Sequence, residues 1–178
     1  MALRDSGYRY GLVTRLLHWA MALLLIYQLG GVVAGALLGE TPLTEAWGSS
    51  HKAVGGLLFV LVVVRALWGL FNLATRPAKV RGALGHIALL GHLALYGLML
   101  TVPALALLRQ YGSGRPYEAF GLTIMQGGGD KIEWMIAPAK AYHGLLGWVL
   151  LIAIGGHILM ALVHHFVFKD DVLKRMAA

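Results

Sequence analysis

The sequence predicts an all-α membrane protein, a bundle of four transmembrane helices that forms a single domain over residues 1–178. Hydrophobic residues make up 58% of the chain and charged residues only 13%, whereas a soluble domain carries roughly 25% charged residues. A membrane-spanning helix needs about 20 mostly apolar residues. Four stretches meet this requirement and together occupy most of the chain, at 16–38, 51–73, 83–108 and 141–168.

The first stretch is expected to be retained as a helix, because its apolar run is longer than the ~7–15 residues of a signal-peptide core. The second is followed by ATRPAKVRG, in which Pro77 and Gly82 mark a plain connection. Pro103 is expected to kink the third helix. The segment 109–140 before the fourth helix is long and contains aromatic residues between GSG and GGG turns, so we expect a flap on the membrane surface.

The cations are concentrated at one end of the predicted bundle. The positive-inside rule therefore places both termini in the cytoplasm and the segment 109–140 outside. The net charge of +7 reflects this topology and gives no reason to expect a nucleic-acid partner. The cations on the predicted cytoplasmic side are Arg4, Arg9, Arg15, Arg76, Lys79, Arg81, Lys169, Lys174 and Arg175.

The chain has eight histidines, and ionisable groups inside a membrane are costly enough to mark functional sites. His143 and His157 are 14 residues apart, so they share one face of the fourth helix and lie about 21 Å apart along its axis. A single metal ion cannot bind both rings, so each needs a partner from another helix. The chain has no cysteine, which excludes thiolate ligands and thioether-attached heme.

The depth of each histidine in the bilayer selects its partner. His18 starts the first helix at the level of His157, and His51 starts the second helix at the level of His143. Two facing histidines are suited to axial ligation of heme iron. A small residue follows each of the four by four positions, which leaves room for a flat porphyrin. These small residues are Ala22, Gly55, Gly147 and Ala161.

The other four histidines are interpreted as structural or interfacial. His86 and His92 are six residues apart and point to different faces of the third helix. His164 and His165 are adjacent, so they cannot share a face. Both lie at the cytoplasmic boundary of the fourth helix, where polar rings reach the headgroup region.

The motifs around these histidines run over nearly the whole chain. They are LLHW, HKAVGGLLFVLVVVRALW, GHLALYGLMLTVPALALL, RPYEAFGLTIM and YHGLLGWVLLIAIGGHILMALVHHFVFKDDVL. In these motifs the chain resembles the bacterial cytochrome b561 family, particularly its short diheme members, the superoxide oxidases.

The resemblance implies two b-type hemes, with His18 and His157 as axial ligands of one and His51 and His143 of the other. It implies an oxidoreductase of the bacterial inner membrane that takes electrons from superoxide at the outer face and passes them to ubiquinone. The hemes carry the redox chemistry, while the protein sets distance, potential and access. No further protein partner is required for this activity.

Cations in or beside the outer segment are candidates for attracting superoxide, because superoxide is an anion. These are Arg109, Arg115, Lys131 and Lys140, and Lys52 adjoins His51. Anchoring to lipid headgroups is the alternative role. Arg65 lies deep in the second helix and is expected to pair with a heme propionate, since intramembrane arginines are usually paired. Snorkelling to the cytoplasmic interface is the alternative.

Two other functions compete with this hypothesis. A cytochrome b subunit that relays electrons between quinone and a soluble dehydrogenase or hydrogenase would use the same histidine pairs, although the short loops leave little surface for a large partner. A histidine-lined metal-ion transporter is disfavoured by the lack of intramembrane carboxylates. No motif indicates where a quinone would bind.

Overall fold

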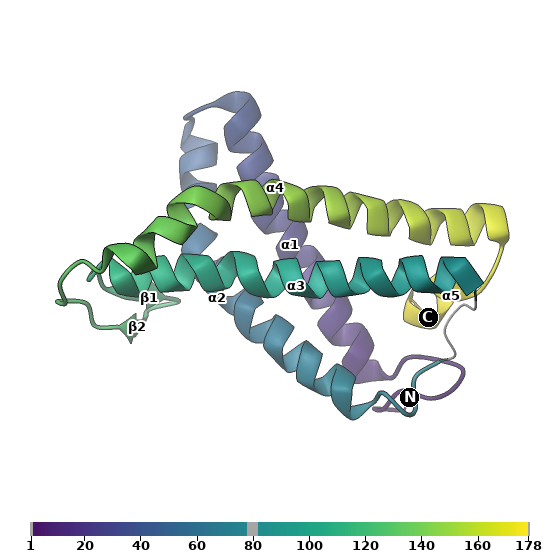
Figure 1. The fold of residues 1–178 in the computed structure, drawn as a ribbon. Helices are drawn as coiled ribbons and strands as arrows, with labels where there is room; N and C mark the ends of the chain where they lie inside the picture. The colour runs from purple at the N-terminus through teal and green to yellow at the C-terminus, as the bar shows by residue number, and fades with distance from the viewer. Residues whose placement is uncertain (1, 78–81, 178) are drawn as a thin grey trace.

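The computed structural model describes residues 2–77 and 82–177, which form helices and one small hairpin (Figure 1). Four helices are long and apolar enough to cross a bilayer. They are α1 (Leu12–Leu38), α2 (Pro42–Phe71), α3 (Gly82–Gly112) and α4 (Glu133–Val163). A π-helical turn, η1 (His164–Phe168), continues α4, and a short helix, α5 (Val172–Ala177), follows it. The four predicted membrane helices are therefore confirmed.

All four helices begin before the predicted apolar stretches, and the largest differences are at α2 and α4, which begin at residues 42 and 133 and not at 51 and 141. At the start of α2, the Thr41 hydroxyl accepts a hydrogen bond from the Thr44 amide at 3.2 Å. The Thr44 hydroxyl accepts one from the Thr41 amide at 2.9 Å, which completes a capping box. Pro42 follows at the first helical position, where its missing N–H costs nothing. Similarly, α4 starts at Glu133 rather than near residue 141.

The bundle is made of two helical hairpins, α1–α2 and α3–α4, which meet where α2 packs against α3. The buried core lies within α1 and α2 and contains Met21, Val54, Leu58 and Val62, with Tyr96 of α3 packed against it. In the described part of the chain, α4 packs closely along α3 but only sparsely against α1 and α2. The predicted ligand histidines of α4 face their partners across this sparsely packed side.

The third loop contains an antiparallel hairpin, β1 (Tyr117–Ala119) and β2 (Leu122–Met125), which the sequence did not lead us to expect. Phe120 and Gly121 at its turn have φ angles of 53° and 77°. Positive φ at both central residues matches the right-handed twist of a two-residue hairpin, and glycine adopts it without strain. Phe120 and Leu122 are 67% and 66% exposed, so the hairpin has apolar side chains at its tip, as a flap on a membrane surface requires.

The two chain termini lie at the same end of the bundle (Figure 1). The Trp19 indole donates a hydrogen bond to the Met176 carbonyl at 3.2 Å, which ties α1 to α5. Asp5 is buried and accepts hydrogen bonds from the Gly11 amide at 2.8 Å and the Thr14 hydroxyl at 2.6 Å. Arg76 lies 3.4 Å from the other Asp5 oxygen. These contacts fix the N-terminal arm against the start of α1 and the end of α2.

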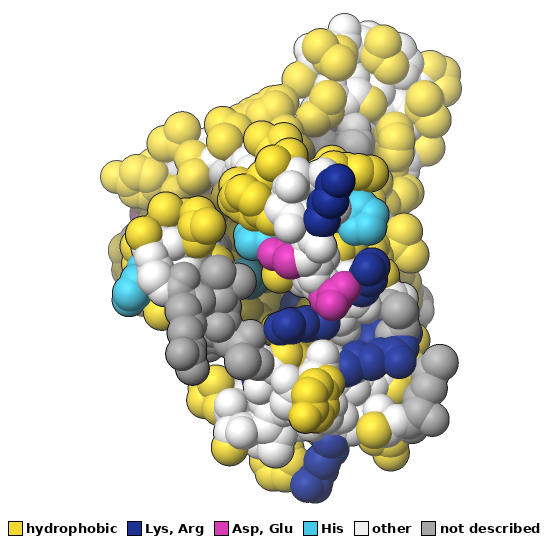
Figure 2. Space-filling model, turned by 90° about the vertical axis from the view of Figure 1, so that its right-hand side faces the viewer, with side chains coloured by type: hydrophobic (Ala, Val, Ile, Leu, Met, Phe, Trp, Pro, Cys, Tyr) yellow, Lys and Arg dark blue, Asp and Glu magenta, His cyan; other side chains and the backbone are white. Residues whose placement is uncertain are grey.

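Lysine and arginine side chains gather on this end, with fewer acidic side chains among them (Figure 2). Lys79 and Arg81, two of the cations predicted on the cytoplasmic side, lie outside the described residues. Which way this end faces in the cell stays a prediction.

Acidic pH is expected to loosen η1 and α5 before it affects the membrane helices. The His164 ring lies 2.6 Å from one Asp170 oxygen, and the Val172 amide donates to the other at 3.0 Å. Partial burial by itself would raise the pKa of Asp170, but these hydrogen bonds and the charges of His164 and Arg175 outweigh it and lower that pKa. The stabilisation is therefore complete above the ordinary aspartate pKa and is lost as the pH falls through the lowered native pKa.

Hydrogen exchange of the amides in residues 164–177, corrected for intrinsic rates, should show this loosening below about pH 4. Asp170→Asn should remove the pH dependence. Asp171→Asn, which removes an exposed pair with Lys174, should retain it. Equal acid sensitivity in both variants would show that the Asp170 carboxylate does not hold the turn.

Candidate functional site

His51 on α2 and His143 on α4 lie next to each other, and we name them the outer histidine pair after the predicted orientation. Their ring centres lie 6.2 Å apart, with the planes at 79°. The Nδ1 atom of His143 lies 2.9 Å from the carbonyl oxygen of Val102 on α3. A carbonyl only accepts hydrogen bonds, so the proton is on Nδ1 and the lone pair of Nε2 is free to bind a metal. A backbone carbonyl of this kind is the usual orienting partner of a ligand histidine.

His18 on α1 and His157 on α4 form the inner histidine pair, with ring centres 6.3 Å apart. Arg65 of α2 lies beside this pair. Its Nη1 atom is 3.0 Å from Nδ1 of His18, and its Nε donates to the Tyr96 hydroxyl of α3 at 3.1 Å. Arg65, which is predicted to pair with a heme propionate, thus contacts His18, a predicted ligand; its pairing with a propionate stays a prediction.

His92 of α3 is a third ring in the inner cluster, at 5.4 Å from His157. Two imidazoles that face each other across an iron have ring centres about 6.4 Å apart, with about 2.0 Å per metal–nitrogen bond and about 1.2 Å from nitrogen to ring centre. Both predicted pairs match this spacing, whereas His92 lies too close to His157. Among the described residues, no three histidine or carboxylate side chains are arranged to hold a metal ion.

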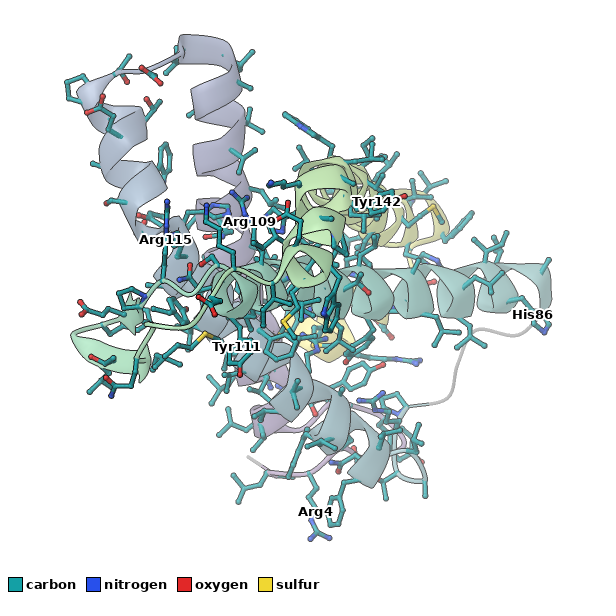
Figure 3. All side chains as sticks on the ribbon, turned by 60° about the vertical axis from the view of Figure 1, so that its left-hand side comes forward. Arg4, His86, Arg109, Tyr111, Arg115 and Tyr142 are labelled. Carbon is teal, nitrogen blue, oxygen red and sulfur yellow. The ribbon has the colours of Figure 1, made fainter. Side chains whose placement is uncertain are left out.

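Sequence reasoning placed His92 with the structural or interfacial histidines and missed its position beside His157. The signal was available, because α3 starts at the same end as α1 and His92 therefore lies at the depth of His18. The other three histidines make contacts elsewhere. His86 lies near the start of α3, with its Nδ1 3.0 Å from the Gly82 carbonyl oxygen (Figure 3). His164 binds Asp170, and His165 packs edge-on against Phe166.

A cavity of about 640 Å³ lies beside the outer histidine pair and is lined by both of its rings. Gly144 and Gly147 form part of its wall, and a Cβ atom added at either would meet no other atom within 4 Å. Gly55, one helical turn after His51, lines the same cavity. A Cβ atom at Gly55 would meet the Gln28 side-chain nitrogen at 3.3 Å, so the open space that a flat ligand requires lies on the α4 side, beside Gly144 and Gly147.

All four cations predicted to attract an anion line this same cavity. They are Arg109, Arg115, Lys131 and Lys140, and Lys52 lines it as well. Glu133 is the acidic residue among them, and its carboxylate binds Lys140 at 3.2 Å. Arg109 and Arg115 lie at the hairpin end of the molecule, whereas Arg4 lies at the opposite end (Figure 3). The structure therefore gathers these five cations in the lining of the cavity beside the outer pair, and we call them the basic rim.

Tyr117 holds the third loop over the cavity. It is 5% exposed, and its hydroxyl donates to the Lys52 carbonyl, one residue after His51, at 3.0 Å. Burial raises the pKa of the Tyr117 phenol, so the group stays a protonated donor. The Gln110 amide donates to the carbonyls of Arg115 and Pro116, both at 3.0 Å. Sequence reasoning missed Tyr117 and Gln110, because a contact between a loop and a distant helix has no local signal.

Gly56→Ala is expected to displace Tyr117 and loosen the loop, because a Cβ atom there would collide with the Tyr117 hydroxyl. Overpacking of this kind costs about 1–3 kcal/mol. Thermal unfolding in detergent should show a lower Tm than for Gly48→Ala, a helical position where a Cβ meets no neighbour. Adding Tyr117→Phe to Gly56→Ala removes the clashing oxygen and should restore part of the loss. Strictly additive effects would contradict this contact.

The sequence model of one family, described as prokaryotic cytochrome b561, matches residues 9–178. The chain belongs to the prokaryotic cytochrome b561 family. The protein named "Cytochrome b561 homolog 2" from Escherichia coli (strain K12) is 29% identical over 99% of this chain and 95% of its own length. "Probable superoxide oxidase CybB" from Yersinia pestis is 30% identical, with 90% of each chain covered.

Membership makes this cytochrome b561 a multi-pass membrane protein of an electron-transfer family that carries b-type heme. The residues present fit such a group at the outer pair. The ring spacing, the free Nε2 of His143 and the open space beside Gly144 and Gly147 suit a planar ligand with a central metal. At the inner pair the spacing also fits, whereas Arg65 is the wrong kind of partner for a ligand histidine.

Proposed function

We propose that this cytochrome b561 transfers electrons from superoxide, at the end that carries the hairpin, through two b hemes to ubiquinone. The observation that carries the proposal is that the basic rim lines the same cavity as the outer histidine pair. A relative named as a probable superoxide oxidase, 30% identical over 90% of this chain, supports the same substrate.

In this proposal His51 and His143 would hold the outer heme, and His18 and His157 would hold the inner heme. Bound heme supplies one-electron redox chemistry at each pair. The two α4 ligands are separated by about 21 Å along the helix. The protein is placed in a bacterial inner membrane with both termini in the cytoplasm, which puts the hairpin and the basic rim on the outside.

The chain's own residues concentrate and admit the anion. A patch of one sign in a low-dielectric cleft raises the local concentration of an opposite charge and its association rate. Gln110 fixes the Arg115 backbone, and Tyr117 fixes the loop that carries it, beside the cavity. Two superoxide anions each give up one electron and leave as dioxygen. One ubiquinone takes up the two electrons with two protons and becomes ubiquinol.

The test uses the detergent-purified protein, with heme quantified per chain. We expect two b hemes per chain, reduced rapidly by anaerobically added potassium superoxide and reoxidised by a short-chain ubiquinone. Superoxide dismutase should abolish the reduction. Two hemes that ignore superoxide and respond to quinol would instead indicate a subunit that relays electrons between quinone and a soluble partner. A protein without heme would refute the ligand assignment.

A further inference from the structure

The two histidine pairs differ in the group that forms a hydrogen bond with Nδ1 of one of their rings. At the outer pair, Nδ1 of His143 contacts the Val102 carbonyl, which is an acceptor. At the inner pair, Nδ1 of His18 contacts the Arg65 guanidinium at 3.0 Å. A guanidinium has only donors and stays protonated in proteins. The same ring atom is therefore a donor in His143 and an acceptor in His18.

This difference decides which nitrogen holds the proton. Because Nδ1 of His18 accepts from Arg65, the proton of its neutral ring is on Nε2, and that nitrogen has no free lone pair. Iron binding through Nε2 needs the other tautomer, and iron binding through Nδ1 needs the position that Arg65 occupies. The Arg65 hydrogen bond and ligation by a neutral His18 are mutually exclusive.

Tyr96 of α3 holds the Arg65 side chain in position beside His18. Its Nε donates to the Tyr96 hydroxyl at 3.1 Å, and its guanidinium carbon lies 6.0 Å from the centre of the Tyr96 ring. Tyr96 itself packs against the buried core of α1 and α2. A charged side chain inside a membrane span loses much free energy of stabilisation when it gives up its polar partners. The contacts of Arg65 with His18 and Tyr96 are therefore stabilised against exchange for other partners.

We propose that Arg65 competes with heme iron for His18, so that the outer site binds heme first and the inner site binds it more weakly. The proposal rests on the histidine ligation proposed above. A hydrogen bond to a charged group carries enough free energy for a roughly ten- to hundredfold difference in affinity. Arg65 is here a positioning residue that acts through His18, which is a different role from binding a propionate.

Two substitutions at the same position separate these roles. In Arg65→Gln the side-chain oxygen can accept a hydrogen bond from the Nδ1–H group, which favours the ligating tautomer of His18. In Arg65→Lys the side chain stays a cation with donors only. Heme would be partitioned at equilibrium between the purified holoprotein and a graded excess of apomyoglobin. The inner-site signal is identified as the part of the spectrum that is absent from the His157→Ala protein.

We expect Arg65→Gln to strengthen inner-site binding roughly ten- to hundredfold, while Arg65→Lys leaves it close to wild type and the outer site is unchanged in both. Weaker binding in Arg65→Gln with retention in Arg65→Lys would overturn the proposal and indicate a propionate partner. Unchanged partition in both would also overturn it. A wild-type protein that takes up no second heme even when heme is added in excess would instead refute the proposed ligation, so the two failures are distinguishable.

A second measurement does not depend on substituting Arg65. In the His157→Ala protein with its remaining heme reduced and diamagnetic, ¹⁵N spectroscopy of labelled histidine reports the tautomer of His18. We expect its proton on Nε2. A proton on Nδ1 would show that Arg65 does not compete for this ring and would overturn the proposal.

Discussion

Replacing His157 with alanine is expected to remove the inner heme and to leave the outer heme largely in place. The substitution deletes one of the two rings whose centres lie 6.3 Å apart, and one remaining imidazole does not provide the second axial bond. The outer pair uses His51 and His143, about four helical turns away on α4. Heme quantified per chain should fall from two to about one, with roughly half of the α-band absorbance lost.

His92→Ala is the matched control, because its ring lies 5.4 Å from His157 and the substitution removes a comparable volume. At that distance His92 does not face His157 across an iron, so the variant should keep both hemes. Loss of neither heme in His157→Ala would refute the ligand assignment. Loss of a heme in His92→Ala, with none lost in His18→Ala, would show that His92, and not His18, is the partner of His157.

Exchanging Arg115 and Lys131 for glutamine together is expected to slow superoxide-driven heme reduction about tenfold at low ionic strength. Both cations line the outer cavity, and charge steering of a small anion changes association rates by about ten- to a thousandfold. Salt screens such steering, with a Debye length of about 10 Å at 0.1 M. The wild-type rate should therefore fall with salt, and the variant rate should depend on salt much less.

A control at the opposite end of the molecule separates local steering from net charge. Arg9→Gln with Lys169→Gln removes the same total charge far from the rim and should leave the reduction rate and its salt dependence unchanged. Reduction by dithionite and the heme content should be the same in both double variants. Equal rates for the rim variant and the wild type at low salt would mean that these cations anchor the loop to lipid and do not steer the substrate.

The fold and most of the candidate site could be predicted from the sequence because their determinants are periodic and local. The 14-residue spacing on α4 puts His143 and His157 on one face regardless of context. Alternating helix direction then sets the depth of His18 and His51. The structure brings these four rings together as two pairs, and it gathers Arg109, Arg115, Lys131 and Lys140 around one cavity.

The hairpin of residues 117–125 and the contacts of Tyr117 could not be predicted in this way. Two very short strands have too few residues for a clear period of two. The Tyr117 contact with the Lys52 carbonyl joins positions 65 residues apart, and it depends on the absence of a side chain at Gly56. Likewise, the length of α4 was underestimated because Glu133, Pro138 and Lys140 interrupt the apolar run in its first turns.

The sequence by itself determined the membrane class, the number of helices and the levels at which histidines meet, because hydropathy and helical period act along the chain. Only the tertiary structure decided what each ring touches. It placed a carbonyl on Nδ1 of His143, an arginine on Nδ1 of His18 and a third ring, His92, beside His157. These contacts depend on the lateral packing and rotation of α3 and α2, and the donor or acceptor character of the neighbour sets the chemistry of each histidine.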